Sequence, residues 1–322
     1  MTQNIFDMIR ESCARVAKRP EFLDINTPLI AEYAQNLELL SDAETFDENH
    51  HYIADEEKTA AYISLLNAIN FGSGDFPLIV EEEFPLIDGN AYFSFSTRLK
   101  EFFENEDDLS PQRFIALSDE DTAQIFKLPY DKPVSAELAG RYTDALRDMA
   151  RWIEADFDGK FYNFVKAADG KAARLVEMLS GQKRFRDVQV YKNDDIYFMK
   201  RGQCLAADLH QGFRHLDGRM LFEDMDCLTM LADCDLPHVL RMDDILFYGP
   251  QLVDKVDNGL FITAGSQEEV ELRAVSLHAV ELIAKEKGVP AIDVDHALWH
   301  RKQLDLYTKT LHLPHRTRTN FY

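Results

Sequence analysis

The sequence is an acidic chain of 322 residues with a formal net charge of −22 at neutral pH. Its apolar fraction of 46% is enough to form a sizeable core and excludes a disordered chain. The negative charge argues against a protein that grips a nucleic-acid backbone, which requires basic patches. Four cysteines without CxxC spacing, and no apolar run of membrane-spanning length, predict a reduced cytoplasmic protein that contacts no membrane.

Helical periodicity dominates the first half of the chain. An amphipathic helix is predicted from Ile5 to Lys18, and Asn26 followed by Pro28 is typical of the start of a second one. Asp55 is placed to cap a third helix. The longest amphipathic stripe predicts a helix from Ser135 to Phe157. Further helices are predicted over residues 91–105, 119–128 and 171–179.

The second half adds a small β-ribbon. Two strand-like stretches, Asp187–Tyr191 and Asp195–Lys200, are separated by a short polar turn, which predicts a hairpin. Helices are predicted from Glu268 to Lys285 and, after Pro290, from Ile292 to Leu304. Because no repeat or flexible linker interrupts the pattern, we expect residues 1–322 to form a single, mainly helical domain, with two packed helical lobes as the alternative.

An isolated carboxylate, Asp233, directly follows the apolar run Met230–Ala232, and Pro237 is expected to close this segment. Burying a carboxylate is costly unless it is paired or has a chemical role. The basic pair Lys200–Arg201 stands at the end of a predicted strand and can hold an anion. Together they predict a site for a polar small molecule, although Asp233 as a helix cap or ion-pair partner, and Lys200–Arg201 as surface charge, remain alternatives.

Both segments belong to a larger set of matches. FMKRGQCLAADL at residues 198–209 resembles YKRAQILVADL, a signature of the queuosine salvage protein family, whose members are queuosine 5′-phosphate N-glycosylases that release queuine. TMLADCDLPH at residues 229–238 resembles the family's TMFADYRLPQ. Other runs that resemble family motifs are LNAINF at 66–71, EEVELR at 268–273, ALW at 297–299 and HRTR at 315–318.

The resemblance implies a helical core similar to that of the helix-hairpin-helix DNA glycosylases. It also implies hydrolysis of queuosine 5′-phosphate, or of a close 7-deazaguanine nucleotide, without an organic cofactor or a metal. Asp233 would stabilise the positive charge that develops on the ribose, or attack it. Lys200 and Arg201 would orient the sugar phosphate. A 7-deazapurine has carbon at position 7, so the departing base must be held or protonated at its other edges.

The residues expected to contact the base follow from the same resemblance. Asp295 and His296 match the start of the family's DYYLWD helix, where the base is contacted. Departures from the family pattern lie at or near the predicted site. His296 replaces a tyrosine, His300 an aspartate and Asp235 an arginine, whereas Leu231 replaces a phenylalanine whose ring could stack on the base.

Histidine pairs leave further alternatives open. His296 and His300 are spaced i, i+4, which is the geometry of a zinc pair, with Asp293 or Asp295 nearby. A metal-dependent hydrolase is therefore one alternative, although the sequence identifies no complete ligand set. A nucleobase- or nucleotide-binding protein that has lost turnover is another. His51 is a candidate for the base site, although a loop pair such as His50–His51 is more often solvated.

Overall fold

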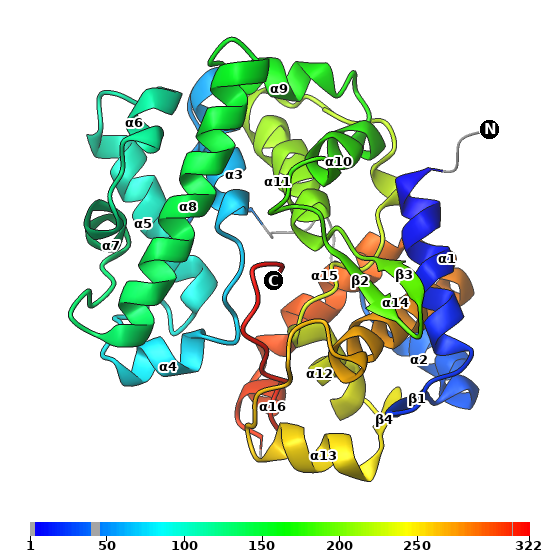
Figure 1. The fold of residues 1–322 in the computed structure, drawn as a ribbon. Coiled ribbons are helices and arrows are strands. Elements are labelled where there is room, and N and C mark those ends of the chain that lie inside the picture. Colours follow the sequence, from blue (N-terminus) through cyan, green and yellow to red (C-terminus); the bar gives the residue numbers. More distant parts are fainter. Residues whose placement is uncertain (1–3, 40–45, 311) are drawn as a thin grey trace. The chain divides into compact units, whose positions relative to one another are not determined.

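The computed structural model describes residues 4–39, 46–310 and 312–322, which are mainly helical with two short antiparallel sheets (Figure 1). This confirms the predicted mainly helical class with a small β-ribbon. The chain divides into two compact units. The first unit contains residues 1–43, 179–203 and 224–322, and the second contains residues 44–178 and 204–223. Within the described ranges, no helix is both long and apolar enough to cross a membrane.

The first unit is built around the long helix α14 (Gln267–Lys287), which packs against α1, α2 and α15 (Figure 1). Ser266 caps its start by accepting a hydrogen bond from the Glu269 N–H, and Gly288 ends it in the left-handed conformation. The other elements of this unit are α1 (Ile5–Ala17), β1 (Leu23–Ile25), η1 (Thr27–Leu29), α2 (Ile30–Asn36), β2 (Val188–Tyr191), β3 (Asp194–Tyr197), η2 (Met225–Cys227), α12 (Asp235–Met242), β4 (Leu246–Tyr248), α13 (Pro250–Asp257), α15 (Ala291–Lys302) and α16 (Asp305–Thr308).

The predicted hairpin is confirmed, because β2 and β3 pair antiparallel around a turn with positive φ at Lys192 and Asn193. The predicted end of the second strand is wrong. β3 stops at Tyr197, Met199 has a φ of 51°, and Lys200 is the first residue of α11 (Lys200–Asp217). The left-handed residue turns the chain from strand to helix, so the basic pair opens a helix.

The segment after Asp233 also differs from the prediction. Pro237 does not close it but lies in the first turn of α12, where a missing N–H leaves no hydrogen bond unmade. The sheet formed by β1 and β4 was not predicted, because its strands are more than two hundred residues apart in the chain. Buried Glu271 of α14 supports β1 by accepting hydrogen bonds from the backbone N–H groups of residues 21–23.

The second unit is an all-helical bundle in its described part. The predicted long helix is α8 (Pro133–Asp156), which packs against α3, α4, α6 and α7. Asp55 caps α3 by accepting a hydrogen bond from the Lys58 N–H, as predicted. The helices of this unit are α3 (Glu56–Ala68), α4 (Phe76–Glu81), α5 (Ala91–Asn105), α6 (Pro111–Ile115), α7 (Asp119–Phe126), α8 and α9 (Phe161–Ala167), and the chain passes between the units within α10 (Ala172–Ser180) and α11.

Candidate active site

Asp233 lies in the first unit, in the segment between η2 and the start of α12. Its side chain is 16% exposed, and its Oδ2 lies 4.0 Å from the Nζ of Lys200, whose side chain is 8% exposed. The Oδ1 of Asp233 accepts a hydrogen bond of 2.9 Å from the Asp235 N–H. The ion-pair alternative for Asp233 is therefore confirmed. The helix-cap alternative is wrong, because Cys234 holds the N-cap position of α12 and Asp233 shapes the turn before it.

The pKa of Asp233 is raised above its ordinary value, because burial removes water from the carboxylate and Asp235 adds a second negative charge. Lys200, the Asp235 N–H and Lys302 oppose this rise. Lys302 lies 3.1 Å from the Asp235 carboxylate, which explains how the chain tolerates an acidic residue where the family motif has an arginine. The Asp233 carboxylate is thus largely buried, and the positive charges of Lys200 and Lys302 offset the effect of burial and of Asp235.

Asp295 of α15 is the second carboxyl group of the site and is buried. Its Oδ1 accepts a hydrogen bond of 2.7 Å from the Leu231 N–H, two residues before Asp233. Burial raises the pKa of Asp295 well above its ordinary value, and the nearby Asp233 raises it further, although the Leu231 N–H and Lys200 oppose this. A buried carboxyl group with a raised pKa holds its proton more readily than an exposed one, so Asp295 can act as a hydrogen-bond donor or acid.

The segment that carries Asp233 is held by side chains rather than by a β-ladder. Gln203 donates hydrogen bonds of 3.0 Å to the Phe198 carbonyl and to the Thr229 hydroxyl, and it accepts one of 2.9 Å from the Thr229 N–H. Arg10 donates to the Cys227 carbonyl at 2.6 Å. Sequence reasoning assigned neither Gln203 nor Arg10 a role, since only the fold shows which backbone groups they reach.

The basic pair is buried, so the alternative of ordinary surface charge is wrong. Its two members point to different partners. Lys200 pairs with Asp233, whereas the guanidinium of Arg201 donates to the Arg184 carbonyl and lies 4.7 Å from the centre of the Phe185 ring. The Arg201 side chain, which was predicted to bind the phosphate, is thus packed against residues 184 and 185. Its phosphate role stays a prediction.

His296 and His300 both lie on α15 and are half-buried. Burial and, to a smaller extent, the nearby His300 together lower the pKa of His296 to about 4, so the His296 imidazole is neutral at pH 7. Among the residues that the structure describes, no group of three or more His, Cys, Asp or Glu side chains is arranged to hold a metal ion. His296 is adjacent to Asp295 in the chain, and both histidines lie on the same helix as Asp295.

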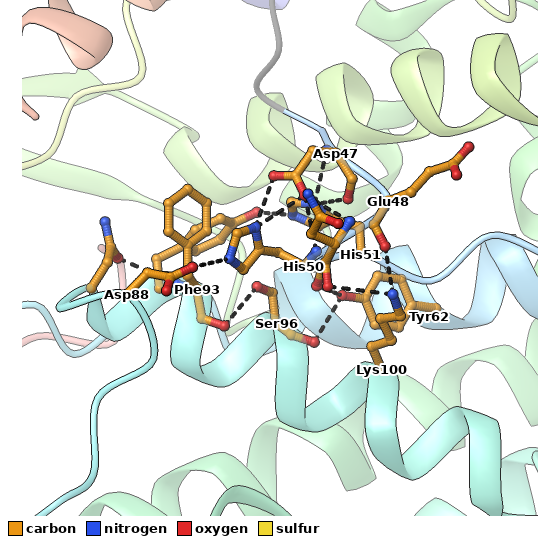
Figure 2. Close-up of polar contacts among 12 residues, drawn as sticks. Asp47, Glu48, His50, His51, Tyr62, Asp88, Phe93, Ser96 and Lys100 are labelled. Atoms are coloured by element: carbon orange, nitrogen blue, oxygen red, sulfur yellow. Dashed lines mark hydrogen bonds and ion pairs between the residues drawn. The ribbon is translucent and has the colours of Figure 1, made fainter.

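His51 belongs to the second unit, whereas the other candidate residues belong to the first. It is buried, stacks on Phe46 at 4.2 Å between ring centroids, and has its Nε2 3.0 Å from the Tyr92 hydroxyl. Burial lowers its pKa to about 4. Figure 2 shows His51 beside His50, whose imidazole contacts the carboxylates of Asp47 and Asp88. The alternative of a solvated pair is wrong for His51.

Comparison with known proteins decides the family. The family model described as queuosine salvage protein matches residues 50–322 of this chain. The chain belongs to the queuosine salvage protein family. The match covers every motif that the sequence comparison identified, from residues 66–71 to the run that starts at His315.

Relatives within the queuosine salvage protein family come from bacteria and eukaryotes. A protein of Sphaerobacter thermophilus is 34% identical over 288 residues, which cover 86% of each chain. One from Dictyostelium discoideum is 33% identical over 185 residues, or 55% of this chain and 56% of the relative. A third, from Schizosaccharomyces pombe, is 30% identical over 56% of this chain and 50% of the relative. Each is named queuosine 5′-phosphate N-glycosylase/hydrolase.

Proposed function

We propose that this protein is an N-glycosidase that hydrolyses queuosine 5′-phosphate to queuine and ribose 5-phosphate. The observation that carries the proposal is the sheltered Asp233–Lys200 pair beside buried Asp295, in a chain of the queuosine salvage family. The names of the relatives support the same substrate. The site presents one anion, one cation and one proton-holding carboxyl group to a polar nucleotide.

Asp233 acts on the sugar. When the bond between C1′ and the base nitrogen breaks, its electron pair leaves with the base and positive charge develops on the ribose ring. The Asp233 carboxylate stabilises this charge, and it does so strongly because few water molecules screen it. Water then adds to C1′ and gives up a proton, and the departing base nitrogen takes up a proton, which completes ribose 5-phosphate and neutral queuine. Lys200 keeps Asp233 ionised and, with Arg201, orients the sugar phosphate.

Asp295 and His296 act on the base. The 7-deazaguanine ring system of queuine has carbon at position 7, so a proton cannot be delivered to a nitrogen there. The raised pKa of Asp295 favours its protonated form, which can donate a hydrogen bond to another edge of the base. His296 is neutral and can donate or accept, and Leu231 and His300 line the same region. His51 is a further candidate for contact with the base.

The wider setting of the reaction is also part of this proposal. The formal charge of −22 favours a free nucleotide over a nucleic acid as the substrate. We place the enzyme in the cytoplasm, where released queuine would return to tRNA modification. We also propose a core similar to that of the helix-hairpin-helix DNA glycosylases, as the family resemblance implies.

Product analysis tests the function and separates the alternatives. The purified protein is incubated with queuosine 5′-phosphate, with and without prior EDTA treatment, and the products are identified by mass spectrometry. We expect equal queuine release in both samples, because the proposed chemistry uses only side chains and water. Release that EDTA abolishes and added zinc restores would favour a metal-dependent hydrolase. Tight binding of the nucleotide without any product would favour a binding protein.

Leu231→Phe tests the placement of the base. The family motif has phenylalanine at this position, and an aromatic ring stacks on a base with about 1–3 kcal/mol. We therefore expect KM for queuosine 5′-phosphate to fall by about fivefold or more, with kcat within about twofold. Steady-state kinetics of the variant and of Leu231→Met, which is flexible but not aromatic, provide the comparison. An unchanged or higher KM for Leu231→Phe alone would place the base elsewhere.

A further inference from the structure

A buried arginine reaches the residue that precedes Asp233. Arg273 lies on α14, its side chain is 0% exposed, and its Nε donates a hydrogen bond of 3.0 Å to the Ala232 carbonyl. A guanidinium is rarely buried completely, because the loss of hydration must be compensated by ion pairs and hydrogen bonds. The hydrogen bond to the Ala232 carbonyl is one of the interactions that compensate for the burial of Arg273, and it ties this side chain to the peptide before Asp233.

Two carboxylates keep Arg273 in place. Its NH1 and NH2 groups donate to the two oxygens of Asp187, and NH1 also lies 3.4 Å from Oε1 of Glu269. Burial lowers the pKa of Arg273, but Asp187 and Glu269 outweigh this and raise it above its ordinary value. The guanidinium is thus permanently charged and fixed on two sides, which leaves its Nε aimed at the Ala232 carbonyl.

Two aromatic rings lie close to the guanidinium of Arg273. The Arg273 Cζ lies 3.9 Å from the centre of the Phe198 ring and 4.6 Å from that of Tyr322. Phe198 is two residues before Lys200, and the left-handed Met199 separates them. Arg273 therefore touches the chain just before each member of the Asp233–Lys200 pair, which comes from two distant segments.

We propose that Arg273 is a positioning residue that fixes the Asp233 carboxylate relative to Lys200. It acts through the Ala232 peptide and the Phe198 ring and has no contact of its own with the reacting atoms. The inference rests on the proposed function for its catalytic consequence, but the geometry that it describes is independent of the substrate. A displacement of about 1 Å at a catalytic group can cost about 100-fold in rate.

Arg273→Lys tests this role because lysine keeps the positive charge for Asp187 but cannot also reach the Ala232 carbonyl. We expect kcat to fall by about 30- to 100-fold with KM within about threefold. Arg241→Lys is the matched control. Arg241 of α12 also forms a two-bond pair with a carboxylate, that of Asp257, and lies over an aromatic ring, that of Tyr248. Its kcat should stay within about twofold of the wild type.

The pKa of Asp233, measured by carboxyl-carbon NMR, distinguishes a positioning role from a loss of protein stability, because lower stability alone would not change the pKa in the folded protein. The charged groups that influence this carboxylate are Lys200, Asp235, Asp295 and Lys302. A loosened Lys200 contact should raise the pKa of Asp233 in folded Arg273→Lys but leave it unchanged in Arg241→Lys. An identical Asp233 titration in wild type and Arg273→Lys would overturn the inference. If the wild type releases no queuine, the proposed function fails, but this titration still decides the positioning role.

Discussion

Asp233→Asn should lower kcat for queuosine 5′-phosphate by at least about 1,000-fold, because an amide cannot carry the charge that stabilises the ribose cation. Asparagine has the same shape, and its oxygen can still accept the hydrogen bond from the Asp235 N–H that shapes the entry to α12. The fold and substrate binding should therefore survive. Steady-state kinetics together with nucleotide binding to the variant measure both halves of this expectation.

Asp235→Asn is the matched control for that variant. Asp235 is two residues away, carries the same charge and pairs with Lys302, but it is not assigned to the reacting sugar. We expect a change in kcat of less than about tenfold, and a shift of the acid limb of the pH profile to lower pH, because Asp235 raises the pKa of Asp233. If Asp233→Asn kept more than a tenth of wild-type kcat, Asp233 would not be the stabilising carboxylate.

Lys200→Met should lower kcat/KM at pH 7 by about 10- to 100-fold, because a sheltered carboxylate loses its cation. The direction of the pH effect depends on which protonation state of Asp233 is active. Asp233 works ionised, and Lys200 lowers its pKa, so removing Lys200 raises that pKa. The acid limb of the kcat/KM profile should therefore move to higher pH, and part of the activity lost at pH 7 should return when the pH is raised. A profile of kcat/KM against pH measures the shift.

Lys255→Met provides the control for Lys200→Met. Lys255 also pairs with a carboxylate, that of Glu268, but it lies on α13 and its side chain is 39% exposed. Its removal should leave the acid limb of the profile where it is in the wild type. A Lys200→Met enzyme with reduced activity but an unshifted acid limb would contradict the ion-pair role and would leave Lys200 only with the sugar phosphate.

Local signals were enough for much of the fold. The helices α1, α8, α14 and α15 and the β2–β3 hairpin follow from periodicity, caps and turn residues, all of which act over a few neighbouring residues. The β1–β4 pair and the strand-to-helix change at Met199 depend on tertiary contacts, which no short window of sequence contains. Pro237 misled because a proline suits the first turn of a helix as well as the end of a segment.

The site shows the same division. Motifs identified Asp233 and Lys200, and the structure places them 4.0 Å apart. The hydrogen bond from the Leu231 N–H to Asp295 joins segments 64 residues apart, and that from Arg273 to the Ala232 carbonyl joins segments 41 apart. A sequence motif can identify such residues, but it does not show with which backbone group each side chain forms a hydrogen bond. The direction of Arg201, toward residues 184 and 185, was beyond sequence reasoning for the same reason.

The most direct test of the account measures both products of queuosine 5′-phosphate in one reaction. Wild type and Asp233→Asn, at equal concentration and with nucleotide binding verified, are incubated in parallel, and queuine and ribose 5-phosphate are quantified by mass spectrometry. The account predicts equal amounts of the two products from the wild type and almost none from the variant. Intact nucleotide in the wild-type sample, or equal release by both proteins, would contradict it.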